Sequence, residues 1–254
     1  MALKIIITGA SSGIGQALAK EYAKQGAVIG LLARRKEELL ALQKILPCKS
    51  LIFPVDVTDL AQCRWAAEEF MALHGAPDIV IANAGISSGT LTENFSDLET
   101  FKKIIATNLI GVTHTFYPFI QVFKNRGSGQ FVGISSVAGI RGLPGAGAYS
   151  SSKAALTNYL ESLRVELAAH NIDVTTIAPG YIKSPMTDAN DFTMPFLMSA
   201  DRAAQSMIKA IQKKKKFLIV PWQMSIVGKI MHVLPTFVWD WLAKKAPRKK
   251  KIPV

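Results

Sequence analysis

The sequence is poor in the residues that build disulfide frameworks and metal centres. Cys48 and Cys63 are the only cysteines among 254 residues, and the four histidines lie far apart along the chain. Two lone cysteines make no disulfide framework, and no Cys or His spacing here matches a metal site. The composition therefore excludes a cystine-stapled secreted domain, and we expect no bound metal and a reducing, cytoplasmic setting.

The sequence also lacks a secretory signal, internal repeats, low-complexity segments and a long uninterrupted apolar run. The start MALKIIITGA has one lysine and a very short apolar run before it enters a glycine motif, which is not the layout of a signal peptide. A bilayer span needs about twenty mostly apolar residues, and the apolar C-terminal region is interrupted too often to supply them. We expect no membrane-spanning helix.

Basic residues are concentrated at one end of the chain. Residues 213–254 contain eleven of the 30 Lys and Arg residues but one of the 18 Asp and Glu residues. They carry +10 of the formal net charge of +12, and the other 212 residues carry +2. The body of the protein is thus nearly neutral, and the composition changes only where the basic region begins.

Short β-branched runs alternate with longer segments in which apolar residues recur every three or four positions. The runs are LKIIIT, AVIGLLA, SLIFPVD, DIVIANAG, GQFVGISS, DVTTIAPG and KFLIVP. Most are apolar nearly throughout, as expected of strands that are covered on both faces. The segments between them, such as 16–25, 60–74 and 154–170, have helical spacing.

This alternation predicts βαβ units, and hence a parallel sheet with right-handed crossovers. With 49% hydrophobic residues the chain can bury a sizeable core, and no linker divides the body. We predict an α/β fold with a single Rossmann-like, doubly wound domain over residues 1–221, in which a seven-stranded parallel sheet is flanked by helices. Residues 222–254 would form a basic C-terminal extension of amphipathic helices.

A glycine-rich loop follows the first predicted strand. In TGASSGIG, the residues Gly9, Gly13 and Gly15 are spaced G-x-x-x-G-x-G. Glycines allow a tight turn and close backbone approach, and the N-terminus of the next helix presents N–H groups to a pyrophosphate. The loop therefore predicts a dinucleotide site.

The end of the second predicted strand indicates which dinucleotide binds. An NAD site usually has an acidic residue there to hold the ribose hydroxyls, but this chain has Ala33 followed by Arg34 and Arg35. Arginine forks suit a 2′-phosphate, so NADP(H) is favoured over NAD(H). The alternative is that both arginines are solvated at the start of a helix, with Glu37 and Glu38 as their partners.

A tyrosine and a lysine stand one helical turn apart in AYSSSKAAL, at Tyr149 and Lys153. Side chains four residues apart share a helix face, and an ammonium beside a phenol should lower the pKa of the phenol. Such a tyrosine could exchange protons nearer neutrality. The spacing alone is common by chance, so its meaning depends on the rest of the chain.

Taken together, these motifs resemble the short-chain dehydrogenase/reductase family over residues 3–221. The match includes TGASSGIG, NAG at residues 83–85, TNLIG, ISSVAG, the Tyr-x-x-x-Lys pair and PG at residues 179–180. The resemblance implies a catalytic tetrad of Asn108, Ser136, Tyr149 and Lys153. The motifs and the resemblance together imply a cofactor site made of Gly9, Ser11, Ser12, Gly13, Ile14, Gly15, Arg34, Arg35, Asp56, Val57, Asn83, Ala84, Gly85, Tyr149, Lys153, Pro179, Gly180, Ile182 and Ser184.

The resemblance also implies a role for each tetrad residue. Tyr149 would be the general acid in carbonyl reduction and the base in the reverse reaction. Lys153 would keep the pKa of the tyrosine low and bind the nicotinamide ribose. Ser136 would donate to the substrate oxygen, where negative charge develops, and Asn108 would hold a water that links Lys153 to solvent.

We therefore expect an NADP(H)-dependent oxidoreductase that interconverts a carbonyl and a secondary alcohol on a small apolar substrate. The loop SPMTDANDFTMPFLMSA carries flexible apolar side chains that suit a lid, although they suit a core or a subunit contact equally well. The rival interpretation is a non-catalytic nucleotide-sensing or membrane-binding module, against which the intact tetrad argues. The resemblance further suggests a homodimer or homotetramer built on helices around residues 101–123 and 154–169.

The extension 222–254 is apolar over most of its surface and ends in the basic cluster KKAPRKKK. Pro235 should divide it into two short helices. An apolar face with tryptophans and flanking lysines is typical of a helix at a membrane interface, so we expect peripheral attachment to an anionic membrane surface. Two alternatives remain: packing on a neighbouring subunit, and roofing of the active site. Nucleic acid is not expected, since no recognition motif accompanies the basic run.

Overall fold

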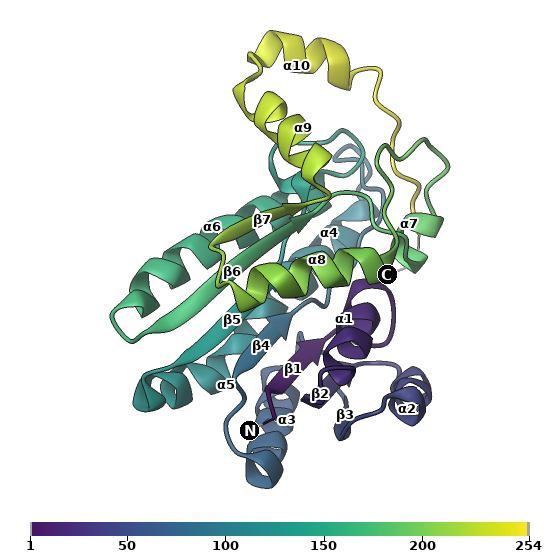
Figure 1. Cartoon of the computed structure of the whole chain (residues 1–254). Helices are drawn as coiled ribbons and strands as arrows, with labels where there is room; N and C mark the ends of the chain where they lie inside the picture. The colour runs from purple at the N-terminus through teal and green to yellow at the C-terminus, as the bar shows by residue number, and fades with distance from the viewer. Residues whose placement is uncertain (1, 253–254) are drawn as a thin grey trace.

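Seven parallel strands form one sheet at the centre of the protein, whose computed structural model describes residues 2–252 (Figure 1). The strands are β1 (Lys4–Thr8), β2 (Val28–Ala33), β3 (Ser50–Pro54), β4 (Ile79–Ala82), β5 (Gly129–Ile134), β6 (Ile172–Pro179) and β7 (Phe217–Val220). Their order is β3-β2-β1-β4-β5-β6-β7, and each neighbouring pair is parallel. The predicted seven-stranded parallel sheet is confirmed.

Helices cover both faces of the sheet, which explains why the strands are apolar nearly throughout. In β1, Ile5 and Ile7 pack into one buried cluster and Ile6 into the other. The first cluster lies under α1 (Gly13–Ala23), α2 (Lys36–Ile45) and α8 (Ala200–Gln212). The second lies under α3 (Leu60–His74), α5 (Gly111–Arg126) and α6 (Gly147–Ala168).

The strand order reverses beside β1, which pairs with β2 on one side and with β4 on the other. In open α/β sheets, ligands bind outside the carboxyl ends of the strands at such a switch point. The loops that follow β1, β2, β4, β5 and β6 all leave the sheet at this edge, so the topology brings the predicted motifs together.

The helical region predicted around residues 101–123 is divided into three pieces. The helix α4 (Asp97–Ile105) passes into one turn of π-helix, η1 (Ala106–Ile110), before α5 begins. Such π-turns often occur at functional sites, and Asn108 lies in this one. A second short element, the 3₁₀ turn η2 (Val137–Gly139), follows Ser136.

The C-terminal extension forms two helices and then turns back. The helices are α9 (Trp222–Val233) and α10 (Thr236–Ala243), so the predicted break at Pro235 is confirmed. They project from one end of the body, and the chain then descends towards the short helix α7 (Pro185–Asp188) (Figure 1). Within residues 2–252, no helix combines the length and the apolar character that crossing a membrane would require.

Candidate active site

The glycine loop between β1 and α1 folds tightly against the end of β4. Gly9 has φ +64°, and a β-carbon there would lie 2.8 Å from the Ala84 Cα. A β-carbon on Gly15 would lie 2.3 Å from the Gly9 carbonyl oxygen and 2.5 Å from Asn83 Nδ2. Gly15 therefore permits the loop to close on itself, and it does not line the cleft described below, although we predicted it as a cofactor contact.

Hydrogen bonds tie the glycine loop to the NAG segment. Asn83 Nδ2 donates to the backbone oxygens of Thr8 (2.9 Å) and Gly9 (3.3 Å). The Thr8 hydroxyl accepts from the backbone N–H groups of Asn83 (3.0 Å) and Ala84 (3.1 Å). These bonds fix the end of β1, whose loop would hold the pyrophosphate, against the end of β4.

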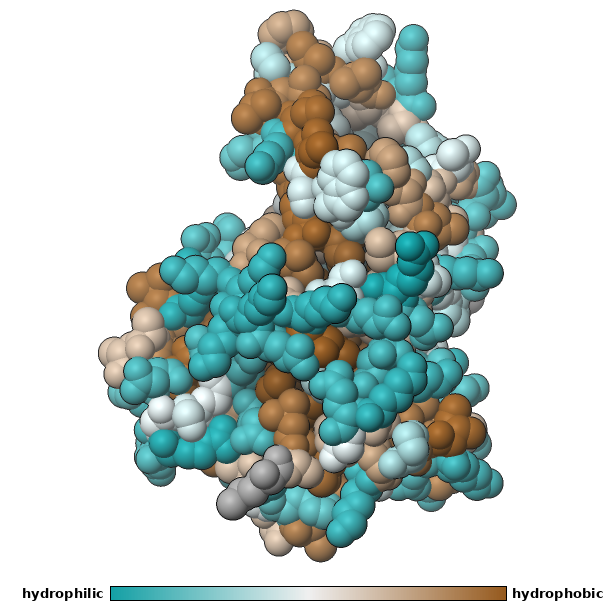
Figure 2. Space-filling view, viewed as in Figure 1, coloured by the Kyte–Doolittle hydropathy of each residue, from teal (hydrophilic) through white to brown (hydrophobic). Residues whose placement is uncertain are grey.

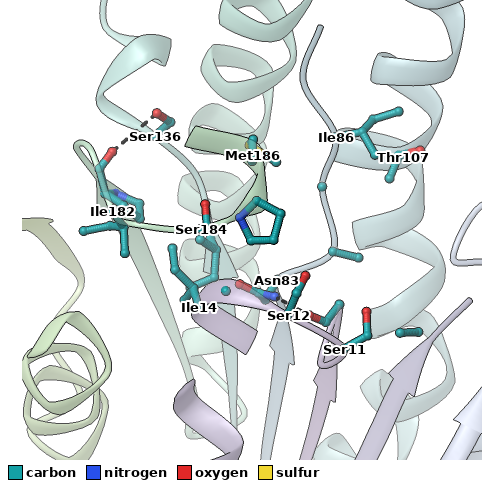
Figure 3. A pocket seen from close by; sticks show the side chains of 18 of the residues that line it. Ser11, Ser12, Ile14, Asn83, Ile86, Thr107, Ser136, Ile182, Ser184 and Met186 are labelled. Carbon is teal, nitrogen blue, oxygen red and sulfur yellow. Dashed lines mark hydrogen bonds between the residues drawn. The ribbon is translucent and has the colours of Figure 1, made fainter. Parts of the chain in front are cut away.

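A cleft with a cavity volume of about 370 Å³ runs along the carboxyl ends of the strands. Figure 3 shows Ser11 and Ser12 at one end of this cleft and Ser136 at the other, with Ile86 and Thr107 on a facing wall. All of the predicted site residues line it except Gly15 and Asn108. The cleft is also lined by residues to which we assigned no site role: Val55, Ile86, Thr107, Ile134, Ser135, Pro185 and Thr187.

Most of these unassigned residues are sequence neighbours of predicted ones. Val55 precedes Asp56, Ser135 precedes Ser136, and Pro185 follows Ser184. Extending each predicted motif by one residue would have found them, because both neighbours at a strand end can reach the same crevice. Thr107 lies beside Asn108 in the π-turn, and the sequence pattern does not predict a π-turn at this position.

Ser136 and Tyr149 come from different elements and meet in the cleft. Ser136 ends the loop after β5, where its hydroxyl caps η2 by accepting from the Ala138 N–H at 3.1 Å and contacts the Pro179 oxygen at 3.4 Å. Tyr149 lies in the first turn of α6 and hydrogen-bonds with the Ser136 side chain. The two hydroxyls are thus positioned to contact one substrate oxygen.

Lys153 lies one turn further along α6 and is 4% exposed. Its Nζ donates to the Ile134 carbonyl oxygen at 2.8 Å and lies 5.8 Å from the centre of the Tyr149 ring. Burial lowers the pKa of Lys153 to about 8 because the charged form loses hydration.

The pKa of Tyr149 differs from the expectation. Burial raises it, and the hydrogen bond with Ser136 opposes this rise. Our prediction that Lys153 lowers the pKa of this phenol is wrong for the arrangement seen here. The ammonium is turned towards the Ile134 carbonyl, and burial is the larger influence on the phenol.

Asn108 is fully buried and fastens the loop after β4. Its Oδ1 accepts from the Ile86 N–H at 2.8 Å, and its Nδ2 donates to the Ile86 oxygen (2.9 Å) and to Ser152 Oγ (3.0 Å). A β-carbon on Gly85 would lie 3.2 Å from Asn108 Oδ1 and 3.5 Å from Lys153 Nζ. Asn108 therefore positions the wall beside Lys153 without lining the cleft itself.

The two arginines after β2 line the cleft but bond differently. Arg35 Nη2 donates to Ser11 Oγ at 3.0 Å and to Ser12 Oγ at 3.1 Å, which braces the glycine loop. Arg34 Nη1 lies 3.8 Å from Asp56 Oδ2, and its side chain is 62% exposed. Within residues 2–252, neither arginine forms an ion pair with Glu37 or Glu38. Their partners therefore differ from those expected if both arginines were simply solvated at the start of the helix.

Comparison with known proteins places the whole arrangement in context. Residues 4–194 match the model of a family described as short chain dehydrogenase. Over 244 residues the chain is 37% identical to an uncharacterized oxidoreductase of Myxococcus xanthus, covering 94% of this chain and 96% of that protein. It is 33% identical over 249 residues to the 11-beta-hydroxysteroid dehydrogenase-like 2 protein of Arabidopsis thaliana, covering 94% of this chain and 79% of that one.

A solved structure is similar as well. ElxO with NADP bound aligns with a TM-score of 0.77 and 26% sequence identity, over 87% of this chain and 97% of that chain.

Proposed function

The chain belongs to the short-chain dehydrogenase family, and from this membership we propose that it is an NADP(H)-dependent oxidoreductase that interconverts a carbonyl and a secondary alcohol on an apolar substrate. One observation carries the proposal: Ser136, Tyr149 and Lys153 line the same cleft as the glycine loop. A non-catalytic nucleotide sensor would not need a buried lysine beside a tyrosine at the end of its nucleotide cleft.

The proposed chemistry involves a bound nicotinamide and the side chains of Ser136, Tyr149 and Lys153. A bound nicotinamide would supply or accept the hydride. The Ser136 hydroxyl would donate to the substrate oxygen as negative charge develops there. Tyr149 would give its phenolic proton to the same oxygen during reduction, and would take it back during oxidation.

Lys153 would assist the phenol after a rearrangement. Its ammonium donates to the Ile134 carbonyl in this structure, and it would turn to the phenolate that proton transfer to the substrate creates. Because burial lowers the pKa of Lys153 to about 8, the lysine remains mostly charged at neutral pH yet loses its proton more easily than an exposed lysine. Asn108 would keep the Ile86 wall fixed while this proton moves.

The residues of the cleft suit a dinucleotide phosphate. Ala33 stands where an NAD site usually has an acid, and both following arginines line the cleft. Among residues 2–252, the ion-pair partner of Arg34 is Asp56 at a long 3.8 Å, so its guanidinium can turn to a 2′-phosphate. The NADP in the related ElxO structure supports the same preference.

The substrate side of the cleft is apolar. Ile86, Ile182 and Met186 line it, with Ile182 on the side of Ser136 and Ser184 and Ile86 on the facing wall (Figure 3). Such a wall suits a hydrocarbon or ring system rather than a sugar. The hydroxysteroid dehydrogenase-like name of the Arabidopsis relative supports this substrate class.

Steady-state reduction of a panel of carbonyls of rising chain length tests the proposal, with the absorbance of the reduced nicotinamide as readout and NADPH and NADH compared. We expect turnover that improves with apolar length and favours NADPH. Absence of turnover with every carbonyl and with both cofactors would refute the proposed activity and favour the sensor.

We also propose that α9 and α10 rest on an anionic membrane surface. Figure 2 shows apolar surface gathered over these helices. Their exposed apolar side chains include Trp222, Ile226, Ile230, Val233, Phe237, Trp241 and Leu242. Not all of the basic cluster supports this attachment, because Lys250 and Lys251 pair with carboxylates of the body.

Co-sedimentation with vesicles tests the membrane proposal. The full chain should pellet with vesicles that contain anionic lipid, and should pellet less at high salt, since the remaining lysines act over a Debye length of about 10 Å at 0.1 M. Phe237→Ser combined with Trp241→Ser should abolish pelleting. Failure of the full chain to pellet at low salt would refute the proposal.

For the assembly we propose a homodimer or homotetramer through α5 and α6. Both helices present large apolar residues to solvent, namely Tyr117 and Val165, each 64% exposed. Sedimentation equilibrium should give a dimer or tetramer, and Tyr117→Glu with Val165→Glu should give monomers. A monomeric wild type would contradict this.

A further inference from the structure

The C-terminal segment 248–252, here called the strap, packs against two loops beside the active site. After α10 the chain turns back towards the body (Figure 1). The Gly89 N–H donates to the Lys250 oxygen at 2.9 Å, and the Ser88 hydroxyl both donates to the Ile252 oxygen (2.8 Å) and accepts from its N–H (2.9 Å). The strap is therefore bonded to the loop that follows β4, one wall of the active site.

Two glycines make room for the strap. A β-carbon on Gly89 would lie 2.1 Å from the Lys249 oxygen, and one on Gly145 would lie 3.0 Å from Arg248 Cβ. Gly145 precedes the first turn of α6, which carries Tyr149. The strap thus touches a second wall, and any larger residue at these glycines would displace it.

Ion pairs hold the strap on two sides. Lys250 Nζ lies 2.8 Å from Asp191 Oδ2 in the loop after α7. Lys251 pairs with Asp97, which is 5% exposed at the start of α4. The surroundings of both carboxylates lower their pKa values, with the hydrogen bond from the strap lysine as the largest cause in each. These two lysines therefore serve to fasten the strap.

Lys249 directly precedes the two fastening lysines and has a different environment. Its Nζ lies 5.9 Å from the centre of the Tyr149 ring. Within residues 2–252, no carboxylate lies within ion-pair distance of it and no acceptor bonds to its ammonium. Burial lowers its pKa because the ammonium is partly desolvated, and the cation–π contact with the Tyr149 ring offsets this loss only in part.

We propose that Lys249 is a specificity-determining residue that binds an anionic group, a carboxylate or a phosphate, on an otherwise apolar carbonyl substrate. The inference rests on the proposed function, because the reacting carbonyl would lie at Tyr149 while the anion lies against the strap. A partly buried, unpaired ammonium gains most from an anion that enters with the substrate, since the surrounding protein screens the pair less than water does. The apolar wall would hold the rest of the molecule.

Matched pairs of carbonyl substrates test this assignment. The probes are the keto acids 4-acetylbenzoate and 5-oxohexanoate, each compared with its methyl ester, and the readout is the ratio of kcat/KM for acid over ester with NADPH. A charge-assisted hydrogen bond corresponds to a preference of about ten- to a hundredfold. We expect the wild type to prefer at least one acid by that factor, and Lys249→Met to lose the preference.

Two further variants separate charge from structure. Lys249→Arg keeps the charge and should retain most of the preference. Lys244→Met removes a positive charge from the same extension, outside the strap, and should keep the wild-type ratio. Thermal unfolding of each variant checks that the fold is intact.

The outcomes are distinct. If the esters are reduced but the acids are not preferred, or if Lys249→Met changes acids and esters by the same factor, the role of Lys249 is refuted while the proposed function stands. An equal gain for acids and esters in Lys249→Met would show that the lysine obstructs the pocket, which also refutes it. If no carbonyl is reduced with either cofactor, the proposed function fails and the inference falls with it.

Discussion

Replacement of Arg34 by alanine should weaken NADPH binding selectively. Within residues 2–252 the one ion pair of Arg34 is with Asp56, at 3.8 Å, so removal of the side chain leaves the glycine loop intact. A 2′-phosphate would lose one charged fork, whereas NADH has no group that Arg34 would hold. The loss should therefore appear with one cofactor and not with the other.

The size of the expected loss in NADPH affinity depends on how exposed the Arg34 side chain is. Hydrogen bonds to charged groups contribute about 1.5–3 kcal/mol, and the Arg34 side chain is 62% exposed, so solvent screening favours the lower end of this range. A loss of about 1.5 kcal/mol corresponds to roughly a tenfold rise in the Kd for NADPH. The Kd for NADH should change by less than about twofold.

Arg35→Ala should behave differently, because Arg35 also braces Ser11 and Ser12 in the glycine loop. Both cofactors should bind less tightly, and NADPH should lose more. Lys36→Ala is the matched control: it removes the next positive charge along the chain, from a residue outside the cleft lining. Its two Kd values should stay at the wild-type level.

The assay is titration of each variant with NADPH and NADH, followed by the fluorescence of the reduced nicotinamide. Equal weakening of both cofactors by Arg34→Ala, or no weakening of either, would refute the reasoning about the 2′-phosphate. Equal effects of Arg34→Ala and Lys36→Ala would show that the preference for NADPH over NADH depends on net charge alone.

Three further predictions concern the architecture of the cleft. Burial lowers the pKa of Lys153 to about 8 from its ordinary 10.5, so between these pH values the unfolded chain binds a proton that the folded chain does not. The free energy of unfolding of the wild type minus that of Lys153→Met, measured with urea, should therefore rise from pH 8 to 10.5 by on the order of 3 kcal/mol. A difference that stays constant with pH would contradict the burial of the ammonium. Gly15→Ala places a β-carbon 2.3 Å from a backbone oxygen and should lower stability by about 1–3 kcal/mol with loss of cofactor binding, whereas Gly142→Ala, which meets nothing within 4 Å, should leave thermal unfolding unchanged. Asn108→Ala leaves the Ile86 backbone groups without their side-chain partner, so urea unfolding should show a loss of about 1–3 kcal/mol; wild-type stability would show that water replaces the amide at no cost.

Local patterns in the sequence were sufficient for the sheet and the glycine loop, whereas the resemblance to the family supplied most of the other cleft residues. A strand covered on both faces is apolar nearly throughout, so the apolar runs around Ile6 and Val80 could be recognised as buried strands. Strands that alternate with helices must be parallel, and parallel strands gather their following loops at one edge. This geometry explains why Gly9 and Ser136, which the resemblance assigned to one site, line the same cleft.

Contacts between distant segments could not be predicted in this way. The pairing of Lys251 with Asp97 joins residues far apart in the chain, and neither is unusual in its own segment. The brace from Arg35 to Ser11 likewise depends on the side-chain direction at a helix start. Sequence spacing placed Tyr149 and Lys153 on one helix face, but the direction of the phenol pKa depends on burial, which spacing does not report.

The central claim is that Tyr149 transfers the proton to the substrate oxygen, and single-turnover kinetics of Tyr149→Phe test it most directly. The variant should bind NADPH with an affinity within about twofold of wild type, because the glycine loop, the arginines and Lys153 are unchanged. Loss of a positioned general acid should slow oxidation of bound NADPH by a carbonyl about 10²- to 10⁴-fold. A single-turnover rate equal to that of the wild type, with the same NADPH affinity, would contradict the account.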